Sequence, residues 1–242
     1  MMASGPRSSV EIRAHLVDEL NAALRRPGMY GGEIALRLLL DLLAYAEHQE
    51  QAWATEQQSM RARGALNALG ARGALEALLP GEEEGAVASL YAEFIHERGW
   101  LHADRILSAT EYAAMHRQLN GWGDRDRTLS EVLETFGPPS VPFGATNPRY
   151  GKTLGYLTER AGAPMVFFHL WNGTASAPGA GTEPAGPLVY DEPILLAIRH
   201  GTGALSDTFA FTPQGRRRRP GEPCGPYGLT GRPRGTQGGG AD

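Results

Sequence analysis

The side chains that could carry out acid–base or metal chemistry are scattered along this chain. It has seven histidines, and no two of them follow the His-x-x-x-His spacing that places two imidazoles on one helix face for zinc. A single cysteine, Cys224, excludes an internal disulfide and a multi-cysteine zinc site. Neither Ser140 nor Ser206 lies in a Gly-x-Ser-x-Gly context. We therefore expect no metal, no cofactor and no assignable catalytic residue.

One histidine remains a candidate for catalysis. His169 lies inside an aromatic, β-type segment, and Asp191 and Glu192 precede another such segment. An imidazole and a carboxylate that meet in one pocket can exchange protons with a substrate. If the chain is an enzyme acting on nucleotides or nucleic acid, we expect His169 with Asp191 or Glu192 between a sheet and helices. The competing interpretation is that His169 is a hydrogen-bonded residue of the sheet.

Composition and charge limit the partners. The 242 residues carry a formal net charge of −4, which gives no general attraction to nucleic acid or anionic membranes. The start of the chain lacks the apolar run of a secretory signal, and the longest apolar stretch, 34–43, is interrupted by charges. We therefore expect a cytoplasmic protein with no membrane association. A local exception is the run Arg216, Arg217, Arg218 and Arg219, which could contact phosphates and would suit a nucleic-acid-associated accessory protein.

The elements that would position a site fall into two groups, helices first and strands after. Ser8 or Ser9 begins a helix whose apolar residues recur every four positions up to Leu24, and Pro27-Gly28 ends it. The helix after Gly32 carries Ile34, Leu38, Leu42 and Tyr45 on one face among further leucines, so we expect it to be central and largely buried. Other expected helical ranges are 62–78 (frayed), 82–97, 110–119 and 128–136, the last with a Thr128/Glu131 capping box.

After residue 139 the pattern becomes that of an antiparallel sheet. Short β-branched and aromatic segments separated by turn residues predict strands over 141–144, 153–158, 165–171, 194–200 and 208–212. The predicted class is α+β: a helical region over 8–137 packed on an antiparallel β module over 138–213, with the two sharing one core. We expect a flexible loop over 172–190 and a disordered Arg/Gly/Pro-rich tail over 214–242.

The most distinctive string is Arg26-Pro27-Gly28-Met29-Tyr30-Gly31. It resembles the segment that opens gyrase-type ATPase domains, but the following helix (38–44, LLLDLLA) lacks the Glu and Asn that such a site requires. The same string, with the Glu93-Phe94-Ile95 helix and Trp100 beyond it, resembles uncharacterised bacterial proteins, some of them immunity proteins of polymorphic toxins. That second resemblance implies a protein-binding role. On local chemistry alone, Pro and Gly make the turn between two helices.

A third resemblance covers 128–171. The short helix 128–136, the turn Phe136-Gly137-Pro138-Pro139 and strands bearing Tyr156 and Trp171 resemble β-lactamase-inhibitor-like and outer-membrane-assembly lipoprotein modules. Such modules bind proteins through loops or an exposed sheet face. The leading expectation is thus a non-enzymatic protein-binding protein, specifically an immunity protein that occludes a toxin. Its expected binding residues, chosen because Arg and aromatic side chains anchor interfaces, are Arg149, Tyr150, Trp171 and Tyr190.

Overall fold

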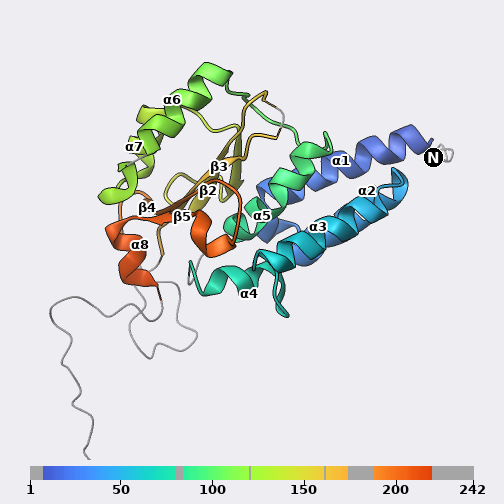
Figure 1. Ribbon diagram of the computed structural model, residues 1–242, viewed down its shortest axis with the longest axis horizontal. Helices are drawn as coiled ribbons and strands as arrows, with labels where there is room; N and C mark the ends of the chain where they lie inside the picture. The colour runs from blue at the N-terminus through green and yellow to red at the C-terminus, as the bar shows by residue number, and fades with distance from the viewer. Residues whose placement is uncertain (1–7, 80–83, 120, 161, 174–187, 220–242) are drawn as a thin grey trace, which may run out of the picture.

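The computed structural model describes residues 8–79, 84–119, 121–160, 162–173 and 188–219 (Figure 1). Its helices are α1 (Ser9–Arg25), α2 (Gly32–Ala46), α3 (Glu50–Ala62), α4 (Gly70–Glu76), α5 (Glu84–Glu97), α6 (Ala109–Leu119), α7 (Leu129–Phe136) and α8 (Pro213–Arg218). Its strands are β1 (Val141–Gly144), β2 (Lys152–Tyr156), β3 (Val166–Trp171), β4 (Ile194–Arg199) and β5 (Phe209–Phe211). Short 3-10 turns are η1 (Pro27–Met29), η2 (Trp122–Asp124) and η3 (Leu205–Thr208). The predicted α+β class is confirmed.

The five strands form one antiparallel sheet in sequence order, β1-β2-β3-β4-β5. Each strand therefore pairs with the next one along the chain. The register is regular except between β3 and β4, where it shifts between His169 and Leu170. That irregularity leaves Leu196 without a direct partner between the pairs made by Leu195 and Ala197.

Helices cover both faces of the sheet, which corrects the expectation of an exposed binding face. In Figure 1 the sheet lies between α1–α5 on one side and α6 and α7 on the other. Every residue of β2, β3 and β4 is buried. Alternate residues of β3 enter different cores: Phe167 and Trp171 join the core with α1–α5, whereas Phe168 and Leu170 join the core with α6 and α7. The sheet thus supports both helical layers and offers neither face to a partner.

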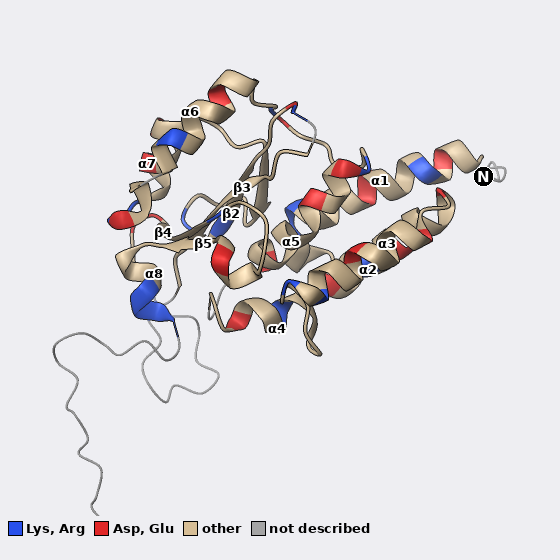
Figure 2. Ribbon diagram, viewed as in Figure 1, with Lys and Arg blue, Asp and Glu red and all other residues tan. Residues whose placement is uncertain are grey.

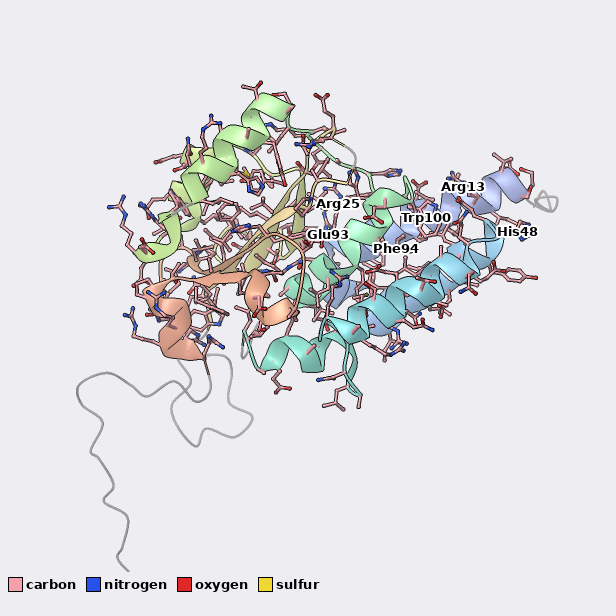
Figure 3. All side chains as sticks on the ribbon, viewed as in Figure 1. Arg13, Arg25, His48, Glu93, Phe94 and Trp100 are labelled. Atoms are coloured by element: carbon pink, nitrogen blue, oxygen red, sulfur yellow. The ribbon has the colours of Figure 1, made fainter. Side chains whose placement is uncertain are left out.

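The core shared by the helical half and the sheet is rich in aromatic rings. Trp53 of α3 packs against Phe94 of α5 with ring centroids 5.1 Å apart. Phe94 in turn meets Trp100 edge-on at 6.0 Å (Figure 3). Asn21 of α1 donates to the Trp100 carbonyl and accepts from the His102 amide. The helical half and the sheet therefore share one core, as expected for modules too small to stand alone.

The helix N-termini follow the capping chemistry predicted from the sequence. Ser8 caps α1 and Thr128 caps α7, each in a capping box closed by a glutamate three residues later. In each box the hydroxyl accepts from the N3 amide and the carboxylate accepts from the cap amide, which satisfies donors that a helix start otherwise leaves open. The α7 box confirms the predicted Thr128/Glu131 pair.

Helix α2 differs from its prediction. The stripe expected to face the core is exposed, with relative exposures of 82% for Ile34, 59% for Leu38, 44% for Leu42 and 72% for Tyr45. The opposite stripe is buried instead, and it consists of Leu36, Leu40, Leu43 and Ala44. Because α2 has apolar residues on both sides, its sequence does not reveal which side faces the core.

Two further elements differ from the sequence expectation. Helix α3 was not predicted, because its sequence EQAWATEQQSMRA is mostly polar and buries only Trp53 and Met60. In the Ala/Arg/Gly-rich stretch over 62–78, the helical residues are Ala62, which ends α3, and Gly70–Glu76; the turn before α4 is closed by Asn67 and Gly70.

The chain also continues in ordered structure beyond residue 214, where a disordered tail was expected. Thr212 caps α8, and Arg217 of this helix pairs with Asp126 at 2.8 Å. The Arg218 guanidinium lies 3.5 Å from the Trp171 ring centroid. Figure 2 shows these arginines gathered on α8 beside the sheet. The arginine run therefore packs against the fold, while the rest of the expected tail, 220–242, lies outside the described residues.

The ends of the long connection between β3 and β4 are tied together. Val189 donates its amide to the Gly173 carbonyl at 2.9 Å. The flexible loop expected over 172–190 otherwise falls on 174–187, outside the described residues. None of the helices in the described part of the chain is long and apolar enough to cross a membrane.

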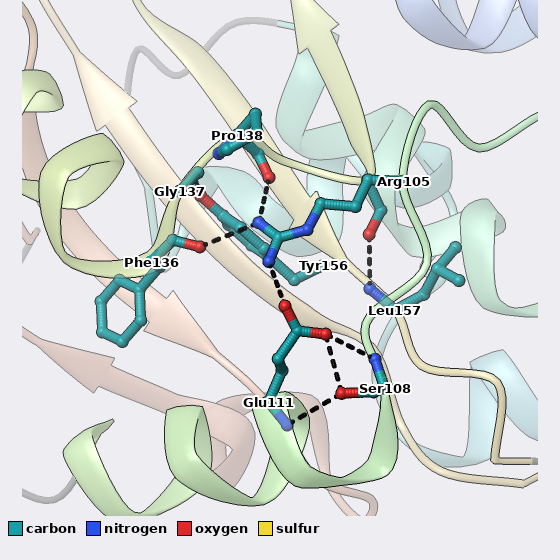
Figure 4. A network of polar contacts seen from close by, with 9 residues as sticks. Arg105, Ser108, Glu111, Phe136, Gly137, Pro138, Tyr156 and Leu157 are labelled. Carbon is teal, nitrogen blue, oxygen red and sulfur yellow. Dashed lines mark hydrogen bonds and ion pairs between the residues drawn. The ribbon is translucent and has the colours of Figure 1, made fainter.

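A polar network joins α6, α7 and β2 (Figure 4). Arg105 pairs with Glu111 at 2.7 Å and also donates to the carbonyls of Phe136 and Pro138. The Ser108 amide and hydroxyl both donate to Glu111 at 2.8 Å. These two donors, followed by Arg105, lower the pKa of Glu111 to about 2.

This pKa predicts a pH dependence of stability. Because the pKa of Glu111 is lower in the folded chain than its ordinary 4.5, its stabilising contribution is present above pH 4.5 and lost as the pH falls towards 2. We expect Glu111→Gln to reduce the loss of stability over that interval. Urea denaturation of wild type and variant at pH 5 and pH 3 measures it; an equal loss in both proteins would contradict the assignment.

Candidate functional site

The distinctive turn adopts a compact conformation between α1 and α2. Helix α1 ends at Arg25, and Pro27 starts the 3-10 turn η1, in which Met29 and Tyr30 donate their amides to the carbonyls of Arg26 and Pro27. Gly31 and Gly32 follow with φ of +90° and +65°, a left-handed backbone that residues with a Cβ adopt at a cost. The two glycines therefore let the chain reverse directly into α2.

This turn forms one wall of a cavity of about 540 Å³. The end of β1 at Gly144 and the following loop residues 145–147 also line it, together with Tyr150. The remaining lining comes from α4 and the first turn of α5, and the full lining is Arg26, Pro27, Gly28, Met29, Arg72, Glu84, Gly85, Gly144, Ala145, Thr146, Asn147 and Tyr150. Most of this surface is apolar. Its size and character match those of sites that hold a small ligand or a single large side chain.

Glu84 supplies the acidic group of the cavity. Its Oε1 accepts from Arg72 Nη2 at 2.8 Å. Its Oε2 is buried and has no hydrogen-bond partner among the described residues. Close contact with the turn explains the glycines there: a Cβ at Gly28 would lie 3.3 Å from Oε2, and one at Gly32 would lie 2.9 Å from Oε1. The Glu84 side chain thus lines the cavity, while its Oε2 is covered by neighbouring protein atoms and lacks a donor among the described residues.

Glu33, the first acidic residue of α2, holds the neighbouring helix in place. Its carboxylate accepts from the amides of Ala71 and Arg72 at 2.7 and 3.1 Å, at the start of α4. It also accepts from the Tyr91 hydroxyl of α5 at 2.6 Å. Burial, and next the hydrogen bond to Glu33, raise the pKa of Tyr91 above its usual value. Glu33 therefore orients α4, and with it Arg72, towards the cavity.

The structure brings together most of the residues predicted to bind a partner. The Asn172 side-chain amide donates to the carbonyls of Arg149 and Tyr190, and the Tyr190 amide donates back to Asn172 Oδ1. Trp171 meets Tyr190 edge-on with ring centroids 6.1 Å apart. Tyr150 is exposed and lines the cavity. Trp171 is only 9% exposed and belongs to the core, so its expected role as an exposed anchor is wrong.

The residues expected for catalysis are engaged separately. His169 is fully buried, its Nδ1 lies 3.0 Å from Thr153 Oγ1, and its ring stacks on Phe209. Burial, and next the Arg199 charge, hold the pKa of His169 well below its ordinary value. Glu192 instead accepts from the Ser130 amide and hydroxyl at the start of α7, and Asp191 is exposed. The interpretation of His169 as a hydrogen-bonded sheet residue is thus confirmed.

The sequence did not identify Glu84, Arg72 or the loop 144–147 as parts of a site. Glu84 reads as one acid of a solvated first helical turn, and Arg72 as one arginine in a biased stretch. The signal that did exist was the Pro-Gly turn, whose glycines mark a close approach of another group. Among the described residues, no cluster of three or more His, Cys, Asp or Glu side chains is arranged to hold a metal ion.

Comparisons with protein-family models, with curated proteins and with solved structures gave no match.

Proposed function

We propose that this chain is a binding protein that recognises a partner protein by taking one of its side chains into the cavity beside the Arg26–Met29 turn. The observation that supports this most is the cavity itself, whose lining is mostly apolar and includes Glu84, a carboxylate with one oxygen that lacks a donor among the described residues. An occupant that is mostly apolar and donates one hydrogen bond matches this lining, and the turn must shift for that donor to reach the covered Oε2. Leaving that oxygen without a donor costs about 1–3 kcal/mol.

Tryptophan is the side chain that best fits these requirements. Its indole is large and apolar, and its single N–H is a donor only. It is also among the side chains that most often dominate interface energies. A cationic side chain fits less well, because Arg26 and Arg72 already line the cavity and Arg72 neutralises Glu84. Tyr150 at the rim adds an aromatic surface of the kind found at protein interfaces.

The finer proposal is that the partner is a toxin and that this chain is its immunity protein. It rests on the resemblance of the Arg26–Tyr30 turn and the helices around it. Binding would then act by occlusion, with the loop 144–150 and the turn covering the toxin's functional surface. The two alternatives, an enzyme and a nucleic-acid accessory protein, receive less support. His169 is buried in the sheet beside Thr153, whereas Glu192 accepts from Ser130 at the start of α7. Arg217 pairs with Asp126, and Arg218 lies over the Trp171 ring.

A pair of small ligands tests the cavity without changing the protein. We expect indole to bind, and 1-methylindole, which lacks the N–H, to bind at least about 10-fold more weakly. Ligand-observed and protein-observed NMR titrations measure both affinities and locate the site through the amide signals of Gly28, Gly85 and Gly144.

The matched protein control uses two tryptophan substitutions. Ala145→Trp places an indole in the cavity and should abolish indole binding, whereas Ala54→Trp on the exposed side of α3 should leave it unchanged. Equal affinity for the two ligands, or indole binding that survives Ala145→Trp, would rule out the proposed role of the cavity.

A further inference from the structure

Helix α2 carries an exposed apolar stripe that has no partner in the described chain. The stripe consists of Ile34, Leu38, Leu42 and Tyr45, and it lies on the side of α2 opposite its buried residues. Exposed apolar side chains that occur singly are ordinary, but four in line on one helix face are typical of an interaction surface. None of these four residues lines the cavity described above.

The order of residues along the stripe is self-complementary. If two copies of α2 pack antiparallel with Leu38 on the twofold axis, the two Leu38 side chains meet at the centre. Ile34 and Leu42 are each four residues from Leu38, about 6 Å along the helix, so each faces the other across the interface. Tyr45, seven residues from the centre, then lies opposite Gly31, where the lack of a side chain leaves room for a ring.

The charges beside the stripe fit the same arrangement. Arg37 and Asp41 lie one turn apart on the same flank of α2, and an antiparallel twofold brings that flank of one copy against that flank of the other. Arg37 then comes within reach of Asp41 of the second copy. No ion pair within the described chain occupies Arg37, and Asp41 uses one oxygen, Oδ1, to accept from Trp53 Nε1 at 2.6 Å. Its second oxygen is left for a further donor.

We infer that α2 is a homodimer interface, with a second copy of this chain packed antiparallel across Leu38. The occupant is a second copy because both the apolar contacts and the charge pairs repeat under one twofold axis. The inference does not depend on the proposed function, since it uses a different set of residues.

Introduced cysteines test the register directly. In a Cys224→Ser background, Leu38→Cys should form an intermolecular disulfide under mild oxidation, because the two copies of residue 38 meet on the axis. Ile34→Cys alone should not, since its two copies lie about 12 Å apart along the helix, beyond the reach of a disulfide. The double variant Ile34→Cys/Leu42→Cys should form an intermolecular disulfide, because residue 34 of one copy faces residue 42 of the other.

Sedimentation of the unmodified protein tests the same contact without cross-linking. We expect a dimer, and Leu38→Asp should raise its dissociation constant by about 100-fold or more, because it sets two carboxylates against each other on the axis. Leu69→Asp, at a leucine outside the stripe that is more exposed than Leu38 (76% against 59%), should leave the dissociation constant unchanged. If the protein is a monomer at about 100 µM, the inference is overturned. Cross-linking of Ile34→Cys as efficient as that of Leu38→Cys would also overturn it.

Discussion

Replacing Arg199 with alanine should lower the free energy of unfolding by about 3–5 kcal/mol, among the largest effects of any single substitution in this protein. Arg199 is buried at the end of β4 and pairs with Glu93 of α5 at 3.3 Å. Its Nη2 donates to the Ser89 carbonyl, and its guanidinium lies 4.1 Å from the Phe167 ring centroid. Removing this cation takes the Arg199 donors away from Glu93 Oε2 and the Ser89 carbonyl, while Glu93 Oε1 still accepts from the Met165 amide.

The comparison that identifies the cause is a pair of variants. Because most of the cost comes from the partner left behind, Arg199→Met/Glu93→Leu should be more stable than Arg199→Met alone. Arg217→Ala, which breaks an exposed ion pair with Asp126, serves as the control and should cost less than about 1 kcal/mol. Urea denaturation of wild type, Arg199→Met, Glu93→Leu, the double variant and Arg217→Ala measures these losses. If the double variant loses the sum of the Arg199→Met and Glu93→Leu losses, the buried pair is not what holds β4 to α5.

Replacing Glu33 with alanine should cost about 2–4 kcal/mol. The substitution removes the acceptor for three donors: the amides of Ala71 and Arg72 and the hydroxyl of Tyr91. The amides belong to the first turn of α4, which no side chain of its own N-cap residue caps. We therefore expect α4 to lose order first, and with it the Arg72–Glu84 pair of the cavity.

A double-mutant cycle separates the Tyr91 contribution. Tyr91→Phe removes the hydroxyl, so the loss caused by Glu33→Ala should be smaller in a Tyr91→Phe background than in the wild type. Hydrogen exchange at Ala71 and Arg72 should accelerate in Glu33→Ala and stay slow in Tyr91→Phe. Additive losses across the cycle, or unchanged exchange at both amides, would show that Glu33 does not hold α4 and α5 together.

The fold was predictable to the extent that local patterns determine it. Ser8 or Ser9 marked the start of α1, a Thr128/Glu131 capping box marked the start of α7, and short β-branched and aromatic segments marked all five strands. Helix α2 was placed correctly but turned the wrong way, because leucines on both of its sides give the same local signal. Which side is buried depends on packing against α1, α3 and α5, and no window of sequence contains that information.

The site was less predictable than the fold. Tyr150 was chosen as an interface aromatic and does line the cavity, whereas Trp171 was chosen for the same reason and is buried under Arg218. Glu84 carries the chemistry of the cavity only because Gly28 and Gly32 approach it from a turn more than 50 residues away in sequence. Such long-range approaches leave only an indirect trace in the sequence, here the glycines themselves.

The measurement that tests the central claim most directly is capture of the partner from the native host with three tagged proteins: wild type, Ala145→Trp and Ala54→Trp. We predict that wild type and Ala54→Trp retain the same stoichiometric protein, that Ala145→Trp does not, and that free indole releases it. Equal capture by Ala145→Trp, or retention that indole leaves unchanged, would contradict recognition through the cavity.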